Sequence, residues 1–473
     1  MSLFLKRICI LLLLASFVFL TGCPPQRPSK KETEKRRAQV AKAKAAALAA
    51  VPAPIAARPA PQQPVTRPVQ RPAARPTPPP APLVPSMTPA EEAVKALVEQ
   101  LGTARNSYKS SPVRAIHELS INADVLTLED VQLIAKLNGL EKLSFTDCRD
   151  FSDDYTKELL PLKDSLTSLK IGNSRITNDS AEILAEFQKL VELNLERNAS
   201  IGNAACRSLA TLENLERLSL IYTGVGEPGL FQIRRLPNLQ SLDIRGCMSI
   251  ANDGMKNIAR IKTLKSFQHY SGSVSDAGLE ELTAAENVES LFLQDFRLSD
   301  AAGESLKKFK NLTDLVLFRC GEFGSQGLLE LKGMPLTRLT LRGLPNVGND
   351  GFEVFRELPN LRRLDLTEMD AVSDGAFIPV AELPNLAILN VEVVGITDEA
   401  LKSIAKLQNL RELKLRQVEI TNAGLDEILK LPRLTSLQLL DNGRVDEAVA
   451  KEKFAGQNYR VLTIGKTKGE VQE

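Results

Sequence analysis

Apolar residues recur along most of this chain in a short alternating pattern, L-x-x-L-x-L, that is typical of a β-strand with one buried face. The middle apolar position returns at steps of 24 or 25 residues, with a single step of 26. A constant period of this size over fifteen copies indicates a solenoid of stacked units. The fifteen positions are Leu119, Leu143, Leu169, Leu193, Leu218, Leu242, Phe267, Leu291, Leu315, Leu339, Leu364, Leu389, Leu413, Leu437 and Leu462.

Each copy predicts a strand, a turn, a helix and a return loop. In one copy, Leu389 and Val391 are two residues apart and therefore face the same side of a strand. Thr397 then stands where it can cap a helix in which Leu401 and Ile404 share one face. One unit has too few apolar residues to offset the entropy cost of ordering it, so we expect its stability to come from stacking on its neighbours.

Residues 89–112 are predicted to provide an N-terminal capping helix for the first repeat. Thr88 and Glu91 have the spacing of a capping box, with proline at the first helical position. The helix is expected to run to Leu101 and to end at Gly102.

The repeat domain is expected over residues 113–465. Tyr459, Leu462 and Ile464 predict its last strand. The polar tail, residues 466–473, would discourage pairing of that edge with another sheet.

The helix starts that read I-T-D/N-x-G-L and the return loops that read L-P-N-L, such as Leu383–Leu386, add a second signature. Together with the strand cores, they make residues 113–465 resemble leucine-rich repeats of the ribonuclease-inhibitor-like and F-box-associated kind. The resemblance implies an α/β leucine-rich-repeat solenoid, a horseshoe with an inner parallel sheet and outer helices. The chain has no F-box-like helical module, so a ubiquitin-ligase function is not carried over, and the fold says nothing about the partner.

The amino-terminal residues have the pattern of a lipoprotein signal peptide. Lys6 and Arg7 precede an uncharged apolar run of 13 residues, Ile8–Leu20, which is shorter than the roughly 20 residues that span a bilayer. The following Leu-Thr-Gly-Cys resembles the bacterial lipobox, and in that family the chain is cut before the cysteine, which is then lipidated. We therefore expect residues 1–22 to be removed and Cys23 to carry the lipid. An ordinary cleaved signal peptide and a short anchor helix are the alternatives.

A lipid on Cys23 predicts attachment to a membrane of the bacterial cell envelope through fatty-acyl chains such as palmitate. Pro24 follows the cysteine, where an aspartate would suggest retention at the inner membrane. The outer membrane is therefore favoured in a cell that has two.

Residues 23–88 are predicted to form a disordered tether. Residues 24–88 have a net charge of +10, and 13 prolines stand between Pro52 and Pro85. Such a segment is extended, and its positive charge favours contact with anionic lipid headgroups, although a merely solvated linker remains the alternative. Residues 89–473 have a net charge of −10, which, together with export, argues against nucleic acid as a partner.

Six cysteines in an exported chain raise the question of disulfides. Cys148, Cys247 and Cys320 each lie five residues after the middle leucine of a strand, in the slot that this repeat class fills with Asn or Cys. These cysteines are separated by three or four units, which at ~4.8 Å per strand exceeds bridging distance. We expect buried free thiols, with Cys206 in a helix, and no metal site.

Two other sequence features, a glycine motif and a histidine, could indicate a cofactor site or catalysis. Gly224–Gly229 reads G-x-G-x-x-G between a strand and a helix, as a dinucleotide site does. Gly229 occupies the same repeat slot as Gly254 and Gly278, so we expect a packing role and no bound cofactor. His269 takes a strand position that neighbouring repeats fill with apolar residues, which predicts a hydrogen-bonded core histidine. No catalytic motif is present in the sequence, and we expect no enzyme.

Large apolar residues fall at solvent-facing positions of three adjacent strands on the concave face. These residues, called the aromatic patch below, are Tyr270, Phe292, Val316 and Phe318. Arg338, Arg342 and Arg363 are expected around them, together with Asp243, Arg245 and Asp314. An aromatic centre with an arginine-rich rim is the composition of a binding hot spot, and scattered surface apolar residues are the alternative.

Two functions follow. The first is a membrane-anchored recognition module that binds a protein or glycan ligand in the envelope through its concave face. The second is a structural tether, which links the membrane to the wall or to another layer through the basic proline-rich segment.

Overall fold

The computed structural model describes residues 87–111, 114–123 and 125–467, which belong to one compact unit of the chain. The expected signal peptide, lipidated Cys23, the tether up to residue 86 and the last six residues lie outside the described part. Within these described ranges, no helix is both long and apolar enough to cross a membrane.

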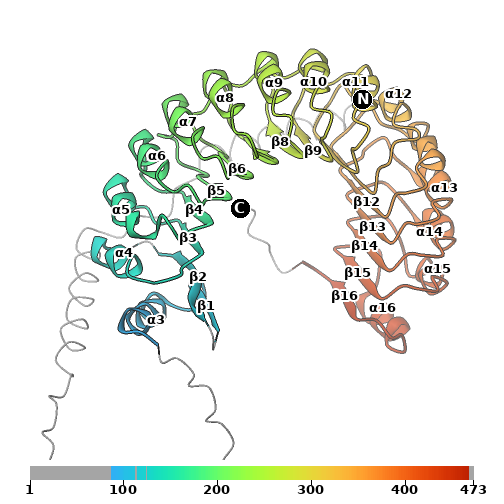
Figure 1. Ribbon diagram of the computed structural model, residues 1–473. Coiled ribbons are helices and arrows are strands. Elements are labelled where there is room, and N and C mark those ends of the chain that lie inside the picture. The colour runs from blue at the N-terminus through green and yellow to red at the C-terminus, as the bar shows by residue number, and fades with distance from the viewer. Residues whose placement is uncertain (1–86, 112–113, 124, 468–473) are drawn as a thin grey trace, which may run out of the picture. The chain divides into compact units, whose positions relative to one another are not determined.

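The described residues form a single sheet of 16 strands, which follow one another in chain order. β1 is antiparallel to β2, and every later strand is parallel to the one before it. Figure 1 shows that the strands line the inner side of a curved solenoid. The strands are β1 (Ser107–Ser111), β2 (Arg114–Asn122), β3 (Lys142–Thr146), β4 (Ser168–Gly172), β5 (Glu192–Asn194), β6 (Arg217–Ser219), β7 (Ser241–Asp243), β8 (Ser266–Tyr270), β9 (Ser290–Gln294), β10 (Asp314–Phe318), β11 (Arg338–Arg342), β12 (Arg363–Thr367), β13 (Ile388–Glu392), β14 (Glu412–Arg416), β15 (Ser436–Leu440) and β16 (Val461–Gly465).

The register of this sheet matches the sequence repeat. Leu291 pairs with Leu315, and Leu315 pairs with Leu339. The same pairing of middle apolar residues runs from Leu119 to Leu462. The predicted solenoid with an inner parallel sheet is therefore confirmed.

Short helices cover the outer side of the sheet (Figure 1). Most have only four to seven residues, because each must fit between two strands of a 24- or 25-residue unit. The helices are α3 (Pro89–Leu101), α4 (Leu128–Ile134), α5 (Asp153–Glu158), α6 (Asn178–Leu184), α7 (Asn203–Leu209), α8 (Glu227–Ile233), α9 (Asn252–Ile258), α10 (Asp276–Leu282), α11 (Ala302–Leu306), α12 (Ser325–Leu329), α13 (Phe377–Val380), α14 (Asp398–Ile404), α15 (Leu425–Ile428) and α16 (Glu447–Phe454), with the 3-10 helices η1 (Leu160–Leu162), η2 (Gly351–Glu357) and η3 (Asp374–Ala376).

The core lies between the sheet and these helices. In β10, Leu315 and Leu317 are fully buried, whereas the residues between and beside them are only half-buried on the concave face. Leu279 and Leu282 of α10 enter the same core from the other side. Burial of leucines from both layers, unit after unit, stabilises the stack by the hydrophobic effect.

The N-terminal helix α3 forms as predicted. The Thr88 backbone amide donates to a carboxylate oxygen of Glu91 (2.6 Å), and the Thr88 hydroxyl accepts from the Glu91 amide (3.3 Å). Glu91 also accepts from the Ile116 amide of β2 (3.0 Å), which fastens the helix to the first parallel strand. Strand β1 was not predicted, because its polar residues give no apolar alternation; its Tyr108 pairs with Leu119.

The predicted last strand, β16, is also present. It follows α16, whose first turn is capped by the Asp446 side chain. Val461 and Leu462 remain 44% and 39% exposed, because no further strand covers β16 among the described residues.

Most strands run into a turn in which the fourth residue after the middle leucine has a positive φ. We call these positions the turn row. Its non-glycine members have φ between 51° and 58°, and Gly246 and Gly343 complete it. The non-glycine members are Asp147, Asn173, Arg197, Tyr222, Asp295, Arg319, Glu368, Val393, Gln417 and Asp441.

Candidate functional site

The sheet brings the aromatic patch together on its concave face. Phe292 of β9 pairs in register with Val316 of β10, as the repeat spacing predicts. Phe318 lies two residues further along β10 and pairs with Arg342 of β11. Tyr270 pairs with Gln294, which separates it from Phe318 by one strand. All four patch side chains are half-buried.

The three predicted rim arginines are engaged in ion pairs. Arg338 pairs with Asp314, its register neighbour on β10. Arg342 pairs with Glu368 (2.9 Å). Arg363 Nε donates to Asp365 two residues along its own strand (2.7 Å), and this carboxylate raises the pKa of Arg363. The rim therefore has alternating charges that largely neutralise one another.

Phe318 lies against two guanidinium groups. The Cζ atoms of Arg319 and Arg342 are 4.5 Å and 4.4 Å from the centroid of its ring, within the range of a cation–π contact. Arg319 donates two hydrogen bonds to Asp295 (2.6 and 2.7 Å), and this carboxylate raises the pKa of Arg319. The ring is thus held in a defined position on the open face of the sheet.

Arg319 and Asp295 were not among the predicted site residues. Both belong to the turn row, one position beyond the strand residues whose direction follows from alternation. Their 24-residue separation was the available signal, because it places them side by side in neighbouring units.

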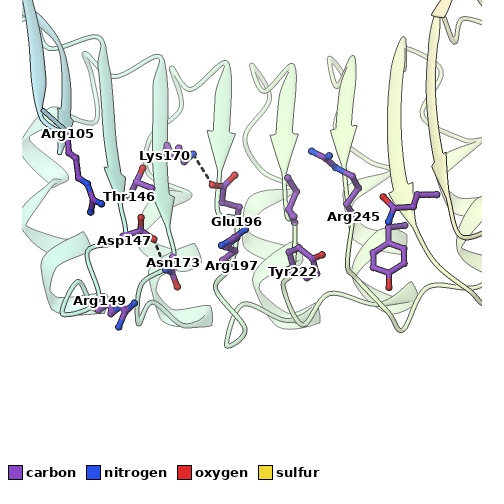
Figure 2. A pocket seen from close by; sticks show the side chains of 13 residues that line it. Arg105, Thr146, Asp147, Arg149, Lys170, Asn173, Glu196, Arg197, Tyr222 and Arg245 are labelled. Atoms are coloured by element: carbon purple, nitrogen blue, oxygen red, sulfur yellow. Dashed lines mark hydrogen bonds and ion pairs between the residues drawn. The ribbon is translucent and has the colours of Figure 1, made fainter. Parts of the chain in front are cut away.

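A second feature of the concave face is a hollow of about 780 Å³ beside β3 to β9 (Figure 2). Its basic lining residues are Arg105, Arg149, Lys170, Arg197 and Arg245, and its acidic ones are Asp147 and Glu196. The sequence analysis did not single out the residues of this hollow except Tyr270 and Arg245, which it shares with the patch and its surroundings.

The charges of the hollow are only partly compensated. Lys170 pairs with Glu196 (2.9 Å), and Arg245 pairs with Asp243 (2.8 Å). Asp147 accepts from the side-chain amide of Asn173 (2.6 Å). The remaining cations of the lining, three arginines, have no ion pair within the part of the chain that the structure describes: Arg105, Arg149 and Arg197.

The cysteines within the repeats are buried and unbridged, as expected: Cys148, Cys206, Cys247 and Cys320. Burial raises the pKa of Cys206 and of Cys320 to about 12. Their thiols are therefore protonated and unreactive at neutral pH. In the described ranges, no group of three or more His, Cys, Asp and Glu residues is arranged to hold a metal ion.

His269 is a buried core residue, in line with its apolar repeat slot. Its Nδ1 lies 3.1 Å from the Ile244 carbonyl oxygen, and Phe296 contacts the ring edge-on. Burial lowers the pKa of His269 to about 4, so the imidazole is neutral at physiological pH. It has no access to a ligand.

The G-x-G-x-x-G segment packs against the preceding unit. The amides of Gly226 and Gly229 donate to Asn203 Oδ1 of the preceding unit. A Cβ at Gly229 would lie 2.9 Å from both that oxygen and Cys206 Sγ. The amides that a phosphate would need are thus already used.

Comparison with known proteins gives a family and a fold. The family described as "Leucine-rich repeat region" matches residues 166–445. Rad7, in the yeast Rad7–Elc1 complex, is structurally similar, with 18% identity and a TM-score of 0.51 over 79% of this chain and 87% of that chain. An internalin of Listeria monocytogenes, inlF, is 15% identical with a TM-score of 0.44, covering 80% of this chain and 94% of that one.

A match to a curated protein covers a short segment. It is the Caenorhabditis elegans "Putative RNA-binding protein EEED8.10", 27% identical over 103 residues. That segment is 21% of this chain, and it spans only 14% of the length of the curated relative.

The family match covers more than half of the chain, and the sheet register repeats through all of that region. The chain belongs to the leucine-rich repeat family.

Proposed function

We propose that this protein is a lipid-anchored recognition module, which binds a protein ligand through the concave face of its repeat domain. The observation that supports this most directly is the position of Phe318, a half-buried ring on the open face of the sheet, between Arg319 and Arg342. Folding does not require an aromatic ring there, because the core is filled by the opposite face of β10. Pre-positioned aromatic and arginine side chains are the residues that dominate protein-binding hot spots.

The ion pairs around the patch are consistent with this role. Arg338, Arg342 and Arg363 are held by carboxylates, so a partner would meet ordered side chains and would lose less entropy on binding. Because Arg338 is the most exposed of the three, we expect Arg338→Ala mainly to slow association and to reduce its salt dependence.

The anchor is the second part of the proposal. The apolar run and the lipobox-like sequence before Cys23 support lipid attachment in the bacterial cell envelope, with the outer membrane favoured where two membranes exist. The basic, proline-rich tether would then separate the recognition surface from the membrane.

Affinity capture from an envelope extract, with the full chain as bait, tests the recognition role. Phe292→Ala with Phe318→Ala should reduce recovery of a captured protein by about tenfold or more, because hot-spot residues contribute about 2 kcal/mol each. The matched control is Phe231→Ala with Ile378→Ala, which removes two exposed apolar side chains (42% and 54%) from helices α8 and α13.

Recovery unchanged by the patch variant, or lost equally in the control, would contradict the proposed site. A captured glycan in place of a protein would contradict the ligand class. Deletion of residues 24–88 distinguishes the recognition role from the structural-tether alternative. A recognition module would keep its affinity for the captured protein, whereas a tether would lose its function.

A further inference from the structure

The hollow differs in charge from the domain that contains it. Its lining residues include five basic and two acidic side chains, whereas residues 89–473 together have a net charge of −10. A positive site on a negative domain attracts anionic ligands locally, while the rest of the surface repels them.

Two arginines of the hollow also differ from those beside the aromatic patch and from Arg245 of the hollow itself, which pairs with Asp243. Arg319, Arg342 and Arg363 each have a carboxylate partner, whereas Arg149 and Arg197 have none within 4 Å among the described residues. An arginine without an internal partner keeps its planar fork of donors free for a carboxylate from outside.

A tyrosine completes this surface. Tyr222 has a φ of 51°, which is rare for an aromatic residue, and its side chain remains largely exposed. Its ring lies over Gly246 of the next unit, where a Cβ would come within 2.3 Å of Tyr222 Cδ1. Only glycine at position 246 permits this arrangement, so the exposed ring is positioned by the fold and is not a free side chain.

These residues follow strands of the same part of the sheet: Arg149 comes after β3, Arg197 after β5 and Tyr222 after β6. The Arg197 amide donates to the Ile221 carbonyl (2.7 Å), and the Tyr222 amide donates to the Arg245 carbonyl (2.8 Å), so the backbone ladder continues into the turn row. From β3, which precedes Arg149, to β6, which precedes Tyr222, the distance is three strand spacings, roughly 14 Å. This is the length of about four residues of an extended peptide.

We propose that the hollow binds an acidic peptide segment, with Arg149 and Arg197 pairing its carboxylates and Tyr222 contacting it through the exposed ring face. This inference rests on the proposed function, because it assigns the charged part of the same concave recognition surface. Tyr270 belongs to both the hollow and the aromatic patch, so one occupant can reach both. A peptide can supply carboxylates to the first and apolar side chains to the second, and arginine clusters are a recurring means of binding acidic motifs.

The absence of tryptophan from the chain provides a selective reporter. In Tyr222→Trp, the indole is the only one in the full chain, so its emission reports on the hollow and not on the basic tether. Titration with hexaglutamate at low ionic strength should change this emission saturably. Adding Arg149→Glu and Arg197→Glu should weaken the binding about tenfold or more, since two charge-assisted contacts are lost and reversed.

The matched control carries Arg362→Glu and Arg411→Glu in the same background. Both are exposed arginines that precede β12 and β14, outside the hollow, and the charge change is identical. The affinity of this control variant for hexaglutamate should stay within about twofold of that of Tyr222→Trp alone. No emission change with hexaglutamate, or an equal loss in both variants, would overturn the proposal.

A second titration, with polygalacturonate, tests whether the hollow binds a glycan instead of a peptide. Tighter binding of this carboxylated glycan than of hexaglutamate, lost on reversal of Arg149 and Arg197, would also overturn the peptide assignment. The capture test with Phe292 and Phe318 changes neither arginine, so failure of this inference and failure of the recognition role can be told apart.

Discussion

Asn203 caps the helix that begins beside Gly226 in the next repeat. The side-chain oxygen of Asn203 accepts the backbone amide of Gly226 at 2.8 Å and that of Gly229 at 3.0 Å. Asn178 makes the same pair of bonds one unit earlier, to Gly202 (2.9 Å) and Ala205 (3.2 Å). In both pairs, a side chain at one helix start satisfies the first amides of the next helix, which ties consecutive units together on the outer side of the sheet.

Asn203→Ala is expected to lower the free energy of unfolding by about 1–3 kcal/mol, because the buried amide of Gly226 loses its hydrogen-bond acceptor. Urea denaturation followed by circular dichroism measures the change. Asn238→Ala is the control, since it removes an exposed amide that donates to the Glu213 carbonyl (2.9 Å) and should cost no more than about 0.5 kcal/mol. Equal losses in the two variants would show that the inter-repeat cap contributes little.

Four thiols should be free in the mature chain, and none should react before unfolding: Cys148, Cys206, Cys247 and Cys320. Burial raises the pKa of Cys206 and Cys320 to about 12, so almost no thiolate exists at neutral pH. A thiol reagent should therefore find no reactive group in the native protein and four in denaturant. Detection of a disulfide among them would refute the assigned packing.

His269 should make stability depend on pH. Its pKa falls from about 6.5 in the unfolded chain to about 4 in the folded one, because burial disfavours the charged imidazole. The unfolded state therefore binds the proton first, and stability present above pH ~6.5 is lost as the pH falls towards ~4, by up to about 3 kcal/mol.

This pH dependence is tested by replacing His269 with leucine, the residue type at the paired position of the next unit. His269→Leu should flatten the pH dependence of the free energy of unfolding between pH ~6.5 and ~4 relative to wild type. His117→Leu, a change at a partly exposed histidine, should preserve it. If both variants follow the wild-type curve, protonation of His269 does not limit stability.

Lipid attachment at Cys23 is tested by metabolic labelling with a fatty acid. Wild type should incorporate label and sediment with membranes, whereas Cys23→Ala should do neither, because the proposed acylation site is gone. Cys148→Ala, which removes a buried thiol, serves as the control and should label like wild type. Equal label in wild type and Cys23→Ala would rule out the anchor.

The repeat period was sufficient to predict the sheet. Because apolar residues must return to the same face in each unit, the spacing from Leu291 to Leu315 also fixed which residues pair, including Phe292 with Val316. The salt bridge from Arg338 to Asp314 was within reach of the same reasoning, as the two are 24 residues apart.

Other features of the structure could not be predicted from the periodicity of the sequence. Strand β1 has a polar sequence and is held by pairing with β2, a tertiary contact. Arg197, Tyr222 and Arg319 lie in the turn row, where a positive φ redirects the side chain and strand alternation no longer applies. The hollow consists mainly of residues of this kind and of loop residues, which explains why the sequence pointed to the aromatic patch alone.

The first and last parallel strands of the sheet, β2 and β16, are not equivalent. β2 is covered by α3 and by the antiparallel β1, whereas β16 has a single described neighbour and leaves Leu462 exposed. In a stack held by nearest-neighbour contacts, local opening is easiest at such an end. Within the repeat domain, thermal fraying and proteolytic trimming would therefore start at the carboxyl end and advance towards α3, so that the arginine-rich hollow outlasts the final repeats.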